Sequence, residues 1–135
     1  MAAKQLRILI CEDDDRLAAL VTETLDADGR FDVVARATNG DEAIRLAQEH
    51  DPDVVLMDIG MPGLDGIDAT RAIRSRDSAQ HVVIYTGSGE YEDVGRADEA
   101  GAAGFLHKEA LTSPDLPDAI QVLHTNFVSG RTEPD

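Results

Sequence analysis

An aspartate at the end of an apolar run is the residue best placed to do chemistry in this sequence. Asp58 follows the apolar residues 54–57 and precedes a loop rich in proline and glycine, residues 59–66. A strand ending in such a loop holds the carboxylate in place and leaves it accessible. Four side chains of matching chemistry follow other apolar segments: Glu12, Asp13, Thr86 and Lys108. Together these groups are what a Mg²⁺-assisted aspartyl-phosphate site needs, with Asp58 as phosphoacceptor.

The adjacent acids Glu12 and Asp13 are candidate Mg²⁺ ligands. Mg²⁺ prefers oxygen ligands, takes few protein carboxylates and keeps several waters. A simpler interpretation is that acids at this point only favour the start of a helix through its dipole. For Asp14 both interpretations stay open, and Asp15 is interpreted only as a residue of the helix start.

The pattern of apolar residues predicts the elements that would position these side chains. Short β-branched or apolar runs predict strands at residues 6–11, 31–36, 53–58, 81–86 and 104–107. Helical spacing between them predicts helices up to Gly29, around 43–47, around 67–73, at 91–102 and around 119–127. This alternation predicts a doubly wound α/β fold with a five-stranded parallel sheet and helices on both faces. Right-handed crossovers put all strand carboxyl ends at one edge, so the reactive side chains should meet there.

Composition limits the class of protein. The 135 residues carry a net charge of −15, from 27 acidic and 12 basic side chains. That charge repels phosphates, so we expect neither nucleic acid nor membrane as a direct partner. The lone cysteine, Cys11, is expected to be buried in a strand, and the absence of a visible signal peptide or long apolar run predicts a cytoplasmic protein. The four histidines are scattered and predict no ligand cluster.

One domain is expected over residues 1–128, followed by a polar tail over residues 129–135 that we expect to be frayed.

Four motifs in order resemble the response-regulator receiver domains of two-component signalling, which have the CheY-like fold. They are Glu12-Asp13-Asp14, the loop 58–66, Thr86-Gly87 and the segment 101–108, and the resemblance extends over about residues 6–128. Lys108 is followed by Glu109-Ala110 rather than by the proline common in this family. Together with Pro117-Asp118-Ala119-Ile120, this departure resembles the NarL/FixJ-type subset.

The resemblance implies a fold and a set of roles. The fold is flavodoxin-like, with strand order 2-1-3-4-5. A sensor histidine kinase or phosphotransfer protein would phosphorylate Asp58, with Mg²⁺ held by Glu12, Asp13, Asp58 and the backbone carbonyl of Gly60. Thr86 and Lys108 would contact the phosphoryl group. Phosphorylation would change the conformation of the surface formed by the last two helices and the last strand, for partner binding or for homodimer formation.

Three positions would tune that switch. Phe105 occupies the place of the family's aromatic switch residue, although a plain core aromatic is an equal alternative. Gly60 and Ser88 would flank the water that removes the phosphoryl group. Neither offers a carboxylate or amide to orient water, so we hypothesise slow self-dephosphorylation, which a lifetime of seconds would refute. The opposite hypothesis is that Gly60 leaves the site open to water.

Three alternatives compete with this interpretation. A haloacid-dehalogenase-like phosphatase also uses a strand-end aspartate, but its second acid would stand where this chain has Gly60, and no cap insertion is present. A binding module that never takes phosphate would usually lack one of the acids. The chain could also be the receiver fragment of a DNA-binding regulator, since receivers of the NarL/FixJ type usually precede a helix-turn-helix domain that is absent from these 135 residues.

Overall fold

The structure is a computed structural model that describes residues 4–87 and 91–132. In these ranges, five strands alternate with five α-helices. The strands are β1 (Leu6–Cys11), β2 (Phe31–Ala37), β3 (Val54–Asp58), β4 (His81–Thr86) and β5 (Phe105–His107). The helices are α1 (Asp15–Asp28), α2 (Gly40–His50), α3 (Gly66–Arg76), α4 (Tyr91–Ala100) and α5 (Leu116–Thr132), with a 3₁₀ helix η1 (Lys108–Thr112) after β5. The predicted alternation is confirmed.

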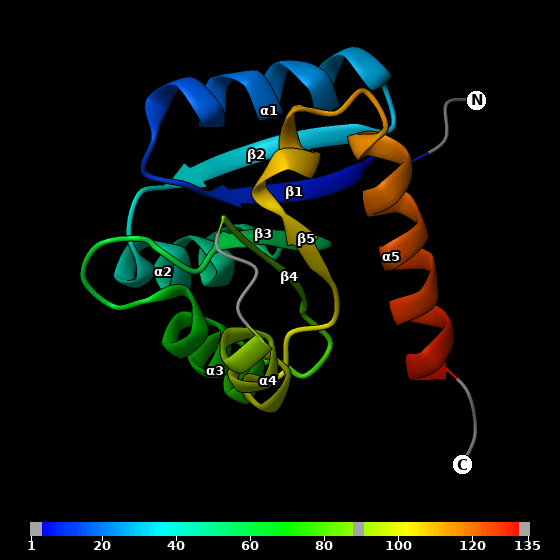
Figure 1. Cartoon of the computed structure of the whole chain (residues 1–135). Coiled ribbons are helices and arrows are strands. Elements are labelled where there is room, and N and C mark those ends of the chain that lie inside the picture. The colour runs from blue at the N-terminus through cyan, green and yellow to red at the C-terminus, as the bar shows by residue number, and fades with distance from the viewer. Residues whose placement is uncertain (1–3, 88–90, 133–135) are drawn as a thin grey trace.

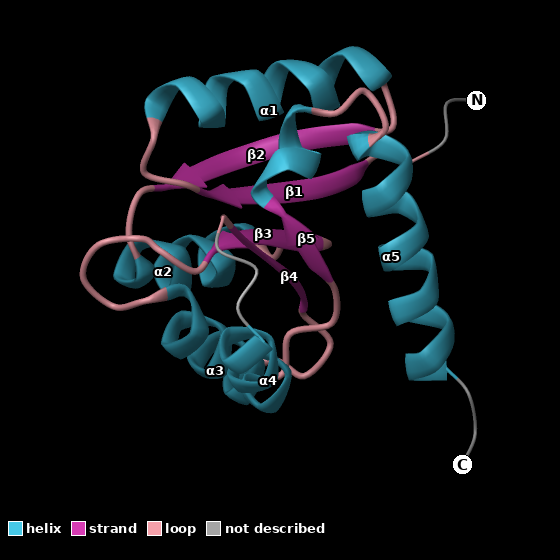
Figure 2. Ribbon diagram, in the orientation of Figure 1, coloured by secondary structure: helices cyan, strands magenta, loops and turns pink. Residues whose placement is uncertain are grey.

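The strands form one parallel sheet in the order β2-β1-β3-β4-β5. Figure 1 and Figure 2 show α1 and α5 on one face of this sheet and α2, α3 and α4 on the other. The doubly wound fold and its strand order are therefore as predicted. In such a sheet the carboxyl ends of all strands lie at one edge, which is where a site is expected.

Alternation of side chains along the central strands divides the core into two clusters. Ile8 and Ile10 pack in the cluster that includes residues of α1 and α5. Leu9 and Cys11 pack in the cluster that includes residues of α2 and α3. Residues 54–57 alternate in the same way, and all of them are fully buried. Burial on both faces explains why residues 8–11 of β1 and 54–57 of β3 are continuous apolar runs rather than alternating ones.

The first two helices begin and end at residues that the sequence indicates. The Asp14 carboxylate accepts hydrogen bonds from two amides in the first turn of α1, and Gly29 ends that helix with a φ of 90°. Asn39 caps α2 by accepting from the amide of Glu42, and Asp51 ends it with a φ of 45°. These contacts satisfy backbone groups that a helix terminus would otherwise leave without partners.

The C-terminal part differs from the prediction in two respects. The 3₁₀ helix η1 was not predicted, and α5 continues to Thr132 although a frayed polar tail was expected from residue 129. Phe127 stacks on His81 and lies 5.4 Å beneath the guanidinium of Arg74, so tertiary contacts hold the last turns of α5. Residues 133–135 of the expected tail lie outside the described residues. Within the described ranges, no helix is both long and apolar enough to cross a membrane.

Two of the scattered histidines meet at the start of β4. His81 is fully buried, and its Nε2 lies 2.6 Å from the carbonyl oxygen of Ala103. A carbonyl can only accept, so Nε2 of His81 carries the hydrogen and Nδ1 is left as an acceptor. The Nδ1 of His124 lies 3.0 Å from this acceptor and must donate to it. The pair joins α5 to β4, a contact that sequence spacing did not predict.

This contact predicts a loss of stability in mild acid. Burial lowers the pKa of His81 to about 4, whereas an unfolded histidine has a pKa of about 6.5. Between these values the unfolded chain binds a proton that the folded chain does not. The contribution of His81 to stability is therefore fully present above pH 6.5. As the pH decreases from there towards 4, the free energy of unfolding should fall by up to about 1.4 kcal/mol per pH unit.

The measurement is urea unfolding at several pH values. His81→Phe retains a flat ring for stacking but cannot titrate, so its stability should depend less steeply on pH between 6.5 and 4. His50→Gln, at the C-terminal end of α2, is the control and should keep the wild-type dependence. Equal slopes in wild type and His81→Phe would show that His81 does not cause the acid sensitivity.

Candidate functional site

Asp58 is the last residue of β3 and is only 5% exposed. It faces Tyr85 in the parallel register between β3 and β4. The amide of Gly60 donates to Asp58 Oδ1 at 3.0 Å, which fixes the rotation of the carboxylate. Helix α3 starts very near Asp58: Gly66, its first residue, packs against the Asp58 carbonyl group. The phosphoacceptor candidate is therefore held by the tight turn between β3 and α3.

Glu12 and Asp13 follow β1 at the same edge. Glu12 is almost completely buried, whereas Asp13 is exposed. One carboxylate oxygen from each of Glu12, Asp13 and Asp58 lies within 4.8 Å of the others. Octahedral Mg²⁺ has ligand oxygens at about 2.1 Å, which puts neighbouring ligands roughly 3 Å apart and opposite ligands roughly 4 Å apart. A small side-chain movement or an intervening water would satisfy that geometry, so the residues present fit a Mg²⁺ ion.

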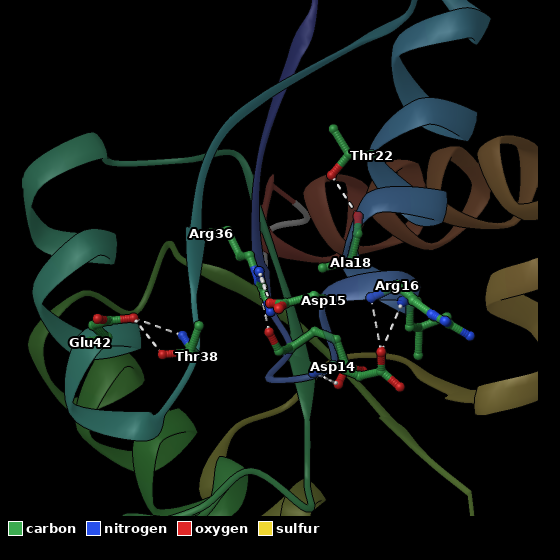
Figure 3. A network of polar contacts seen from close by, with 10 residues as sticks. Asp14, Asp15, Arg16, Ala18, Thr22, Arg36, Thr38 and Glu42 are labelled. Carbon is green, nitrogen blue, oxygen red and sulfur yellow. Dashed lines mark hydrogen bonds and ion pairs between the residues drawn. The ribbon is translucent and has the colours of Figure 1, made fainter.

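The backbone between β1 and α1 is fixed by a network of polar contacts (Figure 3). Arg36 from β2 donates through Nε to the carbonyl oxygen of Glu12 at 2.9 Å and through Nη1 to Asp15 at 2.7 Å. Asp14 caps α1 through its side chain, and its amide donates to Glu12 Oε2 at 3.0 Å. The helix-start interpretation thus holds for both Asp14 and Asp15. These contacts leave Glu12 and Asp13 with little freedom of the main chain.

Lys108 is the cation nearest to the carboxylates in the described part of the chain. Its Nζ lies 4.0 Å from Glu12 Oε1 and 4.0 Å from Asp58 Oδ2. The side chain is 41% exposed, so water weakens both contacts. Burial raises the pKa of Glu12, while the hydrogen bond from the Asp14 amide partly opposes that change. One amine against three acids leaves the site negatively charged, which favours a divalent cation.

Thr86 lies on β4, which pairs with the strand of Asp58, and Phe105 lies on β5, the next strand along the sheet. Thr86 ends β4, one position past Tyr85, and Phe105 begins β5 opposite Ile84. Both residues line a cavity of about 210 Å³ whose wall also includes Val94 of α4. Phe105 is partly buried against the core, so its ring contacts both the core and this cavity. The cavity provides space next to Thr86 into which a side chain could move.

The structure brings together the predicted set Glu12, Asp13, Asp58 and Lys108. Gly60 also lies beside Asp58, since a Cβ atom added to it would be 3.7 Å from Asp58 Oδ1. Ser88 lies outside the described residues.

Sequence reasoning missed Tyr85, which is fully buried beneath the acids. Its hydroxyl donates to Glu12 Oε1 at 2.8 Å. A signal was available, because a tyrosine in a completely buried strand needs a hydrogen-bond partner for its hydroxyl group. The sequence could not say which residue that partner is.

Comparisons with known proteins show the family to which this chain belongs. The family model described as "Response regulator receiver domain" matches residues 8–121. The chemotaxis protein CheY of Halobacterium salinarum is 38% identical over 118 residues, which cover 87% of this chain and 94% of CheY. The transcriptional regulatory protein PdtaR of Mycobacterium tuberculosis is 39% identical over 126 residues, which cover 93% of this chain but 60% of PdtaR.

Solved structures agree in fold. The signal receiver domain of a NarL response regulator from Mycobacterium tuberculosis matches with a TM-score of 0.85 and 30% identity, over 91% of this chain and 98% of that chain. The residues matched by the family model include the acids, the threonine and the lysine. The chain belongs to the receiver domains of two-component response regulators.

Proposed function

We propose that this receiver takes a phosphoryl group on Asp58 in a Mg²⁺-dependent reaction. The observation that carries the proposal is the convergence of Asp58, Glu12, Asp13 and Lys108 at one strand edge. Glu12, Asp13, Asp58 and the Gly60 carbonyl would hold the ion, which would offset the negative charge of the incoming phosphoryl group. The donor would be a sensor histidine kinase or a phosphotransfer protein.

The chemistry asked of the chain is a simple displacement. Oδ1 of Asp58 accepts from the Gly60 amide, so Oδ2, which faces Lys108, is the oxygen we assign as nucleophile. Oδ2 forms a bond to phosphorus while the bond to the donor nitrogen or oxygen breaks, and the donor keeps that electron pair. Lys108 and the Thr86 hydroxyl would then donate hydrogen bonds to the phosphoryl oxygens.

A conformational switch would follow from those two contacts. A shift of Thr86 towards the phosphoryl group would open space in the cavity that Phe105 also lines. Moving a two-state equilibrium from 1:99 to 99:1 needs about 5.5 kcal/mol of differential free energy. New charge-assisted hydrogen bonds from Thr86 and Lys108 would supply a substantial part of it. The surface of α4, β5 and α5 would change, for partner binding or for homodimer formation.

The lengths of the relatives support a second candidate for the output. This chain spans nearly all of CheY but 60% of PdtaR, a transcriptional regulatory protein. It would therefore act either alone through protein contacts, as a receiver of CheY length, or as the receiver part of a longer regulator. In both cases the receiver is a signalling module, and a phosphate-independent binding module is the remaining alternative.

Intact mass after incubation with acetyl phosphate and Mg²⁺ tests the proposal. Wild type should gain the mass of one phosphoryl group, and the gain should vanish in Asp58→Asn and in EDTA. Asp68→Asn is a matched control on the exposed surface of α3 and should be phosphorylated like wild type. An unmodified wild type, with a histidine kinase donor also failing, would favour the phosphate-independent module.

The same adduct tests the hypothesis about its lifetime. Gly60 presents no side chain to the phosphoryl group, so we expect the adduct to persist for minutes or longer. Gly60→Asn should shorten the lifetime, because its amide could orient a water and its Cβ would make only an ordinary contact at 3.7 Å from Asp58 Oδ1. Decay of the wild-type adduct within seconds would refute the hypothesis.

A further inference from the structure

The buried phenol of Tyr85 joins β4 to the acidic loop after β1. Its hydroxyl oxygen lies 2.8 Å from Glu12 Oε1 and 3.2 Å from the carbonyl oxygen of Cys11. Tyr85 and Glu12 are each 1% exposed, so water does not compete for this contact. The two residues are 73 positions apart in the chain, and the contact exists only because β1, β3 and β4 lie side by side.

The direction of this hydrogen bond follows from the chemistry of the partners. A hydroxyl has one hydrogen, and a carboxylate is a stronger acceptor than a carbonyl at a longer distance. The hydrogen therefore points to Glu12. Burial raises the pKa of Tyr85, with the neighbouring charge of Glu12 acting in the same direction. Tyr85 is thus a permanent donor at neutral pH.

Both oxygens of Glu12 are held by donors from this chain. Oε1 accepts from Tyr85, and Oε2 accepts from the amide of Asp14 at 3.0 Å. Lys108 is the competing partner, since its Nζ lies 4.0 Å from Oε1. If the phenol hydroxyl were missing, the buried Oε1 would lose its short donor, and the carboxylate would gain by turning towards Lys108.

We propose that Tyr85 is a positioning residue for the divalent-cation site. Its hydroxyl holds Glu12 Oε1 in place beside Asp13 and Asp58, so that this oxygen does not close on Lys108. The inference rests on the proposed function, since it assumes that the three acids bind Mg²⁺. Partners that orient metal ligands in this way typically contribute 10- to 100-fold to metal affinity.

The alternative is that Tyr85 is only a core side chain. Its ring packs in the cluster with residues of α1 and α5, and a phenylalanine would fill the same space. That role predicts a loss of stability in Tyr85→Phe without a change in Mg²⁺ affinity. In Tyr85→Phe, a positioning role therefore predicts weaker Mg²⁺ binding, whereas a core role predicts lower stability alone.

Titration of the apo protein with Mg²⁺, followed by backbone amide shifts, measures the affinity directly. Tyr85→Phe should weaken Mg²⁺ binding about tenfold. Gln80→Leu is the control for lost stability, because it removes a buried hydrogen bond to Pro52 at the opposite end of the sheet. It should unfold more easily and bind Mg²⁺ like wild type.

A double-mutant cycle with Glu12→Gln shows whether Tyr85 acts through Glu12. In the Glu12→Gln background, Tyr85→Phe should change Mg²⁺ affinity by less than about twofold, because no carboxylate remains to be positioned. Equal affinities of wild type and Tyr85→Phe, or an equal loss in both backgrounds, would overturn the inference. A wild type that binds no Mg²⁺ would instead refute the proposed function and the inference together.

Discussion

Gly66→Ala is expected to lower the free energy of unfolding by about 3 kcal/mol and to displace the phosphoacceptor candidate. A methyl group at this position would overlap the carbonyl oxygen of Asp58 and lie 2.9 Å from Cα of Ile59. Both are main-chain atoms, so no flexible side chain can move aside. The start of α3 would have to move away from β3, and Asp58 is the last residue of β3. Thermal unfolding should show a midpoint lower by about 10 °C.

Gly95→Ala is the matched control for this prediction. The change is chemically identical, but a Cβ atom there would meet nothing within 4 Å. Gly95 lies inside α4, where alanine is the better helix former by about 1 kcal/mol. Gly66→Ala should therefore lower the free energy of unfolding, whereas Gly95→Ala should raise it. Equal and small effects would show that the loop between β3 and α3 accommodates a side chain at Gly66.

Lys108→Met is expected to change Mg²⁺ binding and phosphorylation in opposite directions. The ammonium group lies 4.0 Å from Glu12 and 4.0 Å from Asp58, so it repels a cation bound by these carboxylates. Without it, Mg²⁺ should bind about threefold to tenfold more tightly, since solvent screens part of the repulsion. The phosphoryl group would lose its charged donor, and phosphorylation by acetyl phosphate should slow by about 100-fold.

Two assays on the same variants separate these effects. Amide shifts during a Mg²⁺ titration give the affinity, and intact mass against time gives the rate of phosphorylation. Lys4→Met removes the other lysine of the chain, which is exposed before β1, and should change neither quantity. If Lys108→Met weakened Mg²⁺ binding, the lysine would be organising the acids rather than repelling the ion. A normal phosphorylation rate would remove Lys108 from the proposed chemistry.

The predicted site residues that the structure brings together have one property in common. Asp58, Glu12, Asp13 and Lys108 each stand at the end of a strand or within two residues after it. Parallel strands joined by right-handed crossovers share one carboxyl edge, so local patterns were enough to predict their meeting. Thr86 satisfies the same rule, because it ends β4 directly after Tyr85, the residue that pairs with Asp58.

Contacts between side chains of distant segments could not be predicted in the same way. Tyr85 and Glu12 meet because their strands flank β3, and His81 and His124 meet because α5 packs over β4. The continuation of α5 to Thr132 is of the same kind, since Phe127 is held by His81 and Arg74. Side-chain direction at each of these places depends on packing angles that no local pattern contains.

The sequence by itself determined the class of fold, the order of the elements and the edge that carries the acids, because these depend on periodicity, helix ends and chain connectivity. The tertiary structure decided how the acids are held. It placed the Tyr85 hydroxyl on Glu12, the Arg36 guanidinium on the loop after β1, and Lys108 at equal distances from two carboxylates. These contacts join residues far apart in the chain, and only the packed sheet brings them within hydrogen-bonding or ion-pairing distance.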